Sequence, residues 1–569
     1  MKVASLLMTL GLTSTLMYGQ NWKMSDELQN ADPNSTIPVI VQYSHDPTST
    51  DTQRTHSRGG TLRYTLHSAR GGAFTMRGSA LASVASDPTV VHISADHSIQ
   101  AKLDYTTAAA GASVAWSSGY DGTGIGVAVL DSGITTMPDF NKKNSTYSRI
   151  VYSQDFIGTG GKDAYGHGEH VAGIIAGNGA SSHCGYCTRD LRGMAPNANI
   201  INLRVLDQNG QSSDSVVIAA IDQAIALKSK YNIKVMNLSI GRPIFESYTT
   251  DPLCQAVESA WKAGIVVVVA AGNDGRDATG GGGYGSITAP GNDPYVITVG
   301  AMKSLSTYDP SDDLVASYSS KGPTYLDSVV KPDIMAAGNQ VVSLLAPNNP
   351  TLLQEYPQNQ VPVTYYQSIG SQSMSTKFFT LSGTSMAAAA VSGAVADLLQ
   401  AQPSLTPDQV KARLMETSTK TFAVSFSSVL DNDGTEYDDQ YDVFTVGSGY
   451  LNLAAALQCT DVATGTALSP VANYDPNSGN VYVVFDPSSA WANSAAWGTS
   501  AAWGTGGVWS SSVVNPDQSI WGNSAAWGTS AAWGTSGAWG TSGAWGTSGA
   551  WGTTGPYAQG TDPSITGEQ

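Results

Sequence analysis

Apolar residues gather in several short runs between about residue 111 and residue 457, some of them containing one or two polar residues. The clearest run is 265–271, and others lie at 124–130, 200–205 and 235–240. Between these runs, segments such as 215–228 carry apolar residues at four-residue spacing. Short apolar runs predict strands buried on both faces, and four-residue spacing predicts helices. Their alternation predicts an α/β fold in which helices flank a parallel sheet in three layers.

The N-terminal part of the chain has a different pattern. Residues 21–104 combine β-like runs at 37–43 and 90–94 with a helical stretch near 78–85. This pattern predicts a small α+β unit before a larger domain at 105–460. Residues 1–20 begin with Lys2 and continue as an apolar stretch, which predicts a signal peptide and export; a lipid or membrane anchor is the alternative. No later apolar run is long enough to span a bilayer.

Residues 461–569 contain one further β-like run, at 481–485, and then a hexapeptide repeat of the type Trp-Gly-Thr-Ser-Ala/Gly-Ala. Such a repeat forms either a stacked, solenoid-like array or a low-complexity tail. We favour the tail, because a single large apolar residue per unit offers little core against the chain entropy. The repeated tryptophans are Trp491, Trp497, Trp503, Trp509, Trp521, Trp527, Trp533, Trp539, Trp545 and Trp551.

Charge and cysteine content narrow the function classes. The net charge of −17 and the pI near 4.7 argue against a nucleic-acid partner. Cys184 and Cys187 could form half of a metal site, but no second Cys/His pair completes it, so we expect a small loop disulfide. Pairing of Cys254 with Cys459 stays open.

Polar residues of catalytic types occur where the predicted strands end and helices begin. Asp131 and Asn273 each follow a buried strand, and His167 begins a helix rich in small residues. Ser385 lies in the first turn of an apolar helix that runs to about residue 400. Carboxyl ends of parallel strands gather functional groups, and the positive end of a helix dipole favours negative charge on an oxygen. Taken singly, each residue could equally be a turn former, a helix cap or a loop residue.

The motifs at 127–134, 166–173, 269–274 and 383–387, together with 193–196, 331–334 and 449–452, resemble those of the subtilisin-like serine peptidases, the subtilases. The resemblance covers roughly residues 110–457, and the order Asp, His, Ser is that of subtilisin. It implies that the Ser385 hydroxyl attacks a peptide carbonyl and that His167 transfers the proton. It further implies that Asp131 orients His167 and that Asn273 holds the oxyanion.

The resemblance also implies substrate-binding residues and an inhibitor. The backbone around Ser239, Ile240 and Gly241 would pair with an extended substrate. Ala271 and Gly272 would form one wall of the specificity pocket, with Thr288 near its base, which favours an uncharged side chain before the cleaved bond. Residues 21–104, especially 80–91, resemble the inhibitory pro-segment, and we expect self-cleavage between about residues 100 and 107.

Several residues depart from the family pattern. Glu169 stands where the family usually has Thr, and a carboxylate there would raise the pKa of His167 and shift the activity optimum to higher pH. Ala389 and Ala390 replace the usual Pro-His, with no expected loss of chemistry. Arg242-Pro243 would alter the substrate groove, and His170 is expected to be a packed residue beside the site.

No cofactor or catalytic metal is expected. A structural calcium ion stays open, since the family often binds calcium. The acidic run 431–439 does not fit an EF-hand loop, and a solvated hairpin is favoured there. The sequence therefore predicts a secreted serine endopeptidase made as a self-processed precursor, with protein or peptide substrates and its own pro-segment as inhibitor. The alternative is an inert subtilase-like protein that attaches to surfaces through its Trp repeats.

Overall fold

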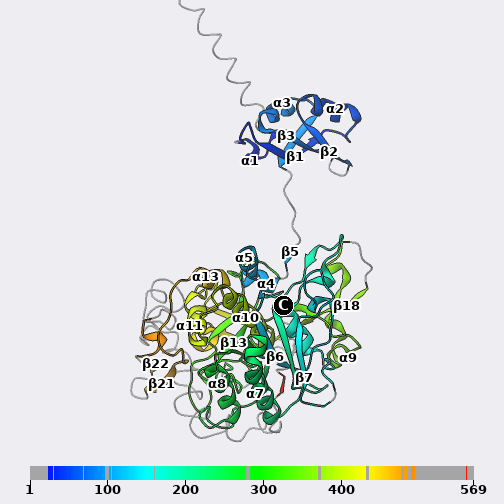
Figure 1. Ribbon diagram of the computed structural model, residues 1–569. Helices are drawn as coiled ribbons and strands as arrows, with labels where there is room; N and C mark the ends of the chain where they lie inside the picture. The colour runs from blue at the N-terminus through cyan, green and yellow to red at the C-terminus, as the bar shows by residue number, and fades with distance from the viewer. Residues whose placement is uncertain are drawn as a thin grey trace, which may run out of the picture. The chain divides into compact units, whose positions relative to one another are not determined.

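The computed structural model describes residues 23–493 and 559–560, apart from 30, 68–69, 96–101, 104, 159, 277–281, 369–372, 431–434, 476–479, 485 and 487. The chain divides into two compact units, residues 1–100 and 101–569 (Figure 1). The predicted signal peptide and the repeat tryptophans after Trp491 lie outside the described residues. None of the described helices is long and apolar enough to cross a membrane.

The first unit is a small α+β fold. Its antiparallel sheet has the order β2-β3-β1-β4, and apolar side chains from the strands and from α3 form its core. This agrees with the α+β unit expected before the larger domain. Its main elements are β1 (Thr36–Tyr43), α2 (Ser49–Ser57), β2 (Thr61–Leu66), β3 (Gly71–Arg77), α3 (Leu81–Ala85) and β4 (Val90–Ala95).

An eight-stranded sheet forms the centre of the second unit, in the order β14-β13-β12-β10-β6-β9-β7, with β15 pairing with β13. All neighbouring strands are parallel except β13 and β14. The predicted α/β fold is confirmed, and the antiparallel pair makes the sheet mixed rather than fully parallel. The strands are β6 (Gly126–Asp131), β7 (Ile150–Asp155), β9 (Asn199–Arg204), β10 (Ile233–Leu238), β12 (Val266–Ala270), β13 (Ile297–Lys303), β14 (Leu314–Val315) and β15 (Ile334–Ala337).

Helices cover both faces of this sheet. Figure 1 shows α7 (Asp214–Tyr231) and α8 (Pro252–Lys262) on one side, and α10 (Thr384–Ala401) and α11 (Pro407–Thr417) on the other. Helix α10 packs on β10, β12, β13 and β15, and also on α6 (His167–Ala176). The Ala-, Gly- and Ser-rich sequence of α10 allows this close approach, and the helix is buried from Thr384 to Leu399.

Shorter elements complete the second unit. They are β5 (Lys102–Leu103), α4 (Tyr105–Ala109), α5 (Ala112–Ser117), β8 (Arg189–Asp190), β11 (Ile240–Gly241), β16 (Val341–Leu344), α9 (Thr351–Glu355), β17 (Gln360–Pro362), β18 (Met374–Leu381), β19 (Phe426–Leu430), β20 (Glu436–Gln440), α12 (Val443–Val446), α13 (Leu453–Gln458), β21 (Val471–Asp475), β22 (Asn480–Val484) and β23 (Gln559–Gly560). Strands β19 and β20 pair antiparallel around the acidic run, as the hairpin prediction requires, although residues 431–434 themselves are not described.

The first repeat tryptophan belongs to the folded core. Trp491 is 1% exposed and packs in a second apolar cluster with Tyr441, Phe444 and Ala472. Its indole N–H donates to the carbonyl oxygen of Leu468. Residues after 460 therefore continue the packing of the peptidase unit up to Trp491, before the repeat begins in full.

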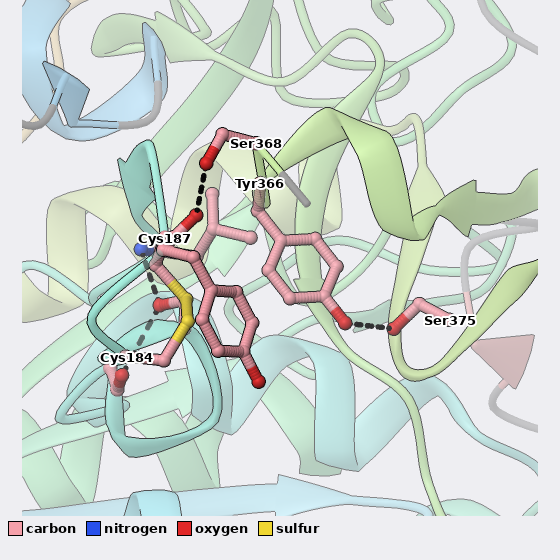
Figure 2. The surroundings of a disulfide bond; sticks show 9 residues. Cys184, Cys187, Tyr366, Ser368 and Ser375 are labelled. Atoms are coloured by element: carbon pink, nitrogen blue, oxygen red, sulfur yellow. Dashed lines mark hydrogen bonds between the residues drawn. A yellow bond between two sulfur atoms is a disulfide. The ribbon is translucent and has the colours of Figure 1, made fainter. Parts of the chain in front are cut away.

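The predicted loop disulfide is present. Cys184 and Cys187 are bonded, whereas Cys254 and Cys459 are both free. Figure 2 shows the loop beside the segment that carries Tyr366 and Ser368. The Ser368 N–H donates to the Tyr186 carbonyl oxygen at 2.9 Å, so backbone bonds as well as the disulfide hold this loop.

Candidate active site

The pair Asp131–His167 lies at the carboxyl edge of the sheet. Asp131 is the last residue of β6, and His167 is the first residue of α6. His167 Nδ1 donates to Asp131 Oδ1 at 2.7 Å, and the two side chains are 0% and 1% exposed. Because Nδ1 carries the proton, Nε2 is the nitrogen able to accept one.

A ring of buried hydrogen bonds joins the loop after Asp131 to the start of α6. Ser132 Oγ donates to Asp163 Oδ1 at 2.8 Å and accepts from Gly168 N at 2.8 Å. Asp163 Oδ1 also accepts from Gly166 N, and Oδ2 from Glu169 N, each at 2.7 Å. Asp163 thus satisfies N–H groups of the first turn of α6, which have no partner within the helix. The ring fixes the loop that carries Asp131 against the helix that carries His167.

Glu169 lies in the first turn of α6, two residues after His167. It is fully buried, and Oε2 accepts from Thr135 N at 2.6 Å. Burial, and then the negative charge of Asp163, raises the pKa of Glu169 well above its ordinary value. A raised pKa favours the neutral form of this carboxyl. The predicted effect of Glu169 on the pKa of His167 stays a prediction.

Ser385 is the second residue of α10, and Asn273 lies beside the turn before it. Asn273 Oδ1 accepts from Thr384 N at 2.9 Å and from Thr384 Oγ1 at 3.0 Å. These two bonds identify Nδ2 as the donor end of the amide. Ser385 Oγ lies 3.4 Å from the carbonyl oxygen of Ser239, and Ser239 Oγ donates to the Ser385 carbonyl oxygen at 2.9 Å. Helices α6 and α10 pack against each other, so the elements that carry His167 and Ser385 are neighbours in the fold.

The residues predicted to bind substrate gather in one place. Thr288 N donates to the Ala271 carbonyl oxygen at 3.0 Å. Gly272 has φ +111°, and a Cβ there would lie 2.7 Å from Ser320 Oγ and 2.9 Å from Thr288 Cγ2. A Cβ at Gly241 would also collide with Thr288. Glycine at both positions is therefore needed for β11, which contains Ile240 and Gly241, to lie against Thr288 and the turn after β12.

Two further predicted features have structural partners. His170 is buried, and Nε2 donates to the carbonyl oxygens of Val341 and Phe379, both at 3.1 Å. Burial, and then the nearby His167, lowers the pKa of His170 to about 3, so it packs as a neutral residue, as predicted. Arg242, expected to alter the groove, is 3% exposed and pairs with Asp214 and Asp251. Its guanidinium is thus held by these carboxylates, and it anchors the end of β11.

Sequence reasoning missed the residues that connect the site. Ser132, Asp163 and Thr384 join separate segments of the site through hydrogen bonds, such as those of Ser132 Oγ to Asp163 and of Thr384 to Asn273. Asp163 lies four residues before the first residue of α6, outside the usual N-cap position, so no sequence signal marks its bonds to Gly166 N and Glu169 N. Among the described residues, Glu416, Cys459 and Asp461 place metal-type ligand atoms within 4.8 Å of one another, away from the catalytic pair in sequence. Partly exposed groups of this kind are common without an ion, and we assign no metal to them.

Comparison with known proteins agrees with this geometry. Residues 122–449 match the family described as the subtilase family. The chain is 38% identical to the serine protease AprX of Bacillus subtilis over 330 residues, which are 56% of this chain and 66% of that protein. It is 30% identical to subtilisin DY of Bacillus licheniformis over 60% of this chain and 93% of that protein. It is 31% identical to an extracellular serine proteinase of Thermus sp. over 61% of this chain and 70% of that protein.

These matches span the whole central sheet and both helices of the candidate site. The chain covers slightly less than two thirds of AprX, and more of the other two relatives. The buried bond between Asp131 and His167 is the arrangement that a catalytic triad requires. The chain belongs to the subtilase family, and its central domain is that of a subtilisin-like serine endopeptidase.

Proposed function

We propose that this protein is a secreted serine endopeptidase, made as a precursor that processes itself, with Asp131, His167 and Ser385 as its triad. The observation that carries the proposal is the buried 2.7 Å bond between His167 and Asp131, on a helix that packs against the helix bearing Ser385. That bond fixes the imidazole tautomer needed for proton transfer to and from a serine.

Each residue then has a distinct role. Ser385 Oγ attacks the peptide carbonyl carbon while His167 Nε2 takes its proton. His167 returns the proton to the leaving amine as the peptide bond breaks, which leaves an acyl-enzyme that water hydrolyses by the same steps. Asp131 stays ionised and stabilises the imidazolium.

Asn273 is proposed to stabilise the oxyanion through Nδ2, together with the backbone N–H of Ser385. Its Oδ1 is held by Thr384, which pre-orients the amide before substrate binds. Replacing Asn273 with Ala should lower kcat by roughly 10²–10³-fold with little change in KM, the range known for the corresponding donor of subtilisin. A loss confined to KM would contradict this role.

We propose that substrates bind as an added strand along β11. Ser239, Ile240 and Gly241 would offer backbone groups, and Ala271, Gly272 and Thr288 would line the pocket for the residue before the cleaved bond. No described side chain among these six is charged. Peptides with an uncharged residue at that position should therefore be cleaved faster than matched peptides with Asp or Lys.

A labelled fluorophosphonate tests the catalytic assignment directly. Wild-type protein should react, and Ser385→Ala should not. Ser392→Ala is the matched control, because Ser392 is another buried serine of α10 and its hydroxyl bonds to Asn237 instead. Equal labelling of wild type and Ser385→Ala would overturn the proposal.

Self-processing and export need separate tests. The predicted cleavage between about residues 100 and 107 falls near the boundary of the two compact units. Ser385→Ala protein should keep its N-terminal unit in a pure preparation and lose it when wild-type protein is added. Cleavage in the pure variant would rule out self-processing. Recovery of wild-type protein from the medium, starting near residue 20 or residue 104, would support export.

The alternative of an inert protein that binds surfaces through its Trp repeats has no support among the described residues. Trp491, the first repeat tryptophan, is buried and is not available as a binding face. The other repeats lie outside the described part of the chain.

A further inference from the structure

The edge of β11 already carries a strand from the same chain. Ile240–Gly241 pairs antiparallel with β23, Gln559–Gly560, in the register Ile240↔Gly560 and Gly241↔Gln559. Both strands belong to the same compact unit, and β23 is the short red segment in Figure 1. More than three hundred positions separate the two strands in sequence, so this is a long-range contact of the C-terminal region.

The backbone directly after β11 is also paired, and the residues around it are buried. The chain directly after β11 pairs on its own with Ala289: Arg242 N donates to the Ala289 carbonyl oxygen at 3.0 Å, and Ala289 N donates back at 2.8 Å. Ile240 and Ser385 are both 0% exposed. A strand edge offers one row of N–H and C=O groups, so a substrate and β23 cannot pair with it at the same time.

We propose that the C-terminal segment containing Gln559–Gly560 is an intramolecular ligand of the substrate strand and competes with peptide substrates. This inference rests on the proposed role of β11 in substrate binding. The segment is tethered to the domain it occupies, so its local concentration does not depend on protein concentration. The result is a self-limited peptidase whose own C-terminal region must leave before a substrate enters.

The expected size of the effect follows from the occupied fraction. A ligand that binds only the open form has its apparent affinity reduced by the fraction of molecules that are open. If β23 occupies β11 in at least half of the molecules, removing it should lower KM by about 2-fold or more and leave kcat unchanged. Residues of the catalytic machinery are untouched by this change.

Two variants test the proposal. One chain ends at Ala558, and the other carries Gln559→Pro and Gly560→Pro, which remove both backbone N–H groups of β23. Thr553→Pro with Thr554→Pro is the matched control outside β23. Both test variants should show the lower KM, and the control should match wild type. An equal KM in all four proteins would overturn the proposal.

A binding measurement separates this proposal from the catalytic one. A labelled peptide of residues 556–569 should bind Ser385→Ala protein that ends at Ala558, and bind the full-length Ser385→Ala protein less tightly, because there the site is filled. The same peptide with both prolines should bind neither. Equal affinity for the two proteins would refute the intramolecular ligand, whatever the catalytic activity. Failure of the fluorophosphonate to label Ser385 would instead refute the proposed function.

Discussion

Replacing Glu169 with Gln gives the sharpest test of the electrostatics of this site. Glu169 is fully buried in the first turn of α6, and its Oε2 accepts from the N–H of Thr135. Burial, followed by the charge of Asp163, raises its pKa well above its ordinary value of 4.5. Gln has nearly the same shape and keeps an oxygen to accept from Thr135, but it does not titrate.

The sign of the effect follows from proton binding. Between the unfolded pKa and the raised folded pKa, the folded protein binds one proton more than the unfolded chain. The stabilisation from Glu169 is therefore complete below the unfolded pKa and decreases as pH rises through this window, by about 1.4 kcal/mol per pH unit. The Gln variant lacks this loss. Its free energy of unfolding, relative to wild type, should rise with the same slope.

Urea unfolding measures this difference. Both proteins should carry Ser385→Ala, so that self-digestion does not distort the curves, and should be compared between about pH 5 and pH 7. Parallel plots of unfolding free energy against pH would refute the raised pKa. In catalytically active protein, Glu169→Gln and Glu169→Thr should both keep the wild-type pH profile of kcat. A shift of that profile would indicate instead that Glu169 carries a negative charge that acts on His167.

Three other changes probe the surroundings of the site. Asp163→Asn replaces the oxygen that accepts from Glu169 N with an NH2 donor, so kcat should fall by about 10- to 100-fold with KM nearly unchanged. If Glu169→Gln lowers kcat by the same factor, Asp163 has no specific role in positioning the site. Gly272→Ala forces a Cβ against Thr288 at positive φ, and should cost about 1–3 kcal/mol by urea unfolding and raise KM; wild-type stability would contradict the packing. Cys184→Ser with Cys187→Ser opens only a short loop, so the loss should be about 2 kcal/mol or less, with kcat/KM retained; a large loss of activity would tie this loop to catalysis.

Much of the fold was predictable because its strands are buried on both faces. Strands β6 and β12 read as continuous apolar runs, and α7 shows clear four-residue spacing. Strand β13 is equally buried but was not predicted, because Thr298 and Gly300 interrupt its apolar run. In the fold, Thr298 Oγ1 donates to the Gly291 carbonyl oxygen at 2.6 Å, which satisfies the buried hydroxyl. Such compensation depends on tertiary contacts and leaves no pattern in sequence.

In the candidate site too, some positions could be predicted from the sequence and others could not. Asp131 and Asn273 could be placed at one edge of the sheet, because the ends of parallel strands meet there. The contact between Thr384 and Asn273 could not, since it joins the first residue of α10 to a loop residue 111 positions away. The burial of Arg242 was equally hidden, because its partners Asp214 and Asp251 come from other segments. Motifs thus identify reactive groups, whereas the contacts that orient those groups emerge only from the fold.

Three carboxyl groups lie around the start of α6, and each is held by a different set of hydrogen-bond donors. Asp131 is held by His167 and by Ser132 N, and Asp163 accepts from the hydroxyl of Ser132 and from N–H groups of the first helical turn. Donors of this kind stabilise the ionised form, even though burial raises the pKa of Asp163. Glu169 accepts from Thr135, and burial followed by the charge of Asp163 raises its pKa well above the ordinary value. A raised pKa favours the neutral carboxyl, so Glu169 can hold the loop at Thr135 through a hydrogen bond while it adds less negative charge beside His167 than an ordinary carboxylate would.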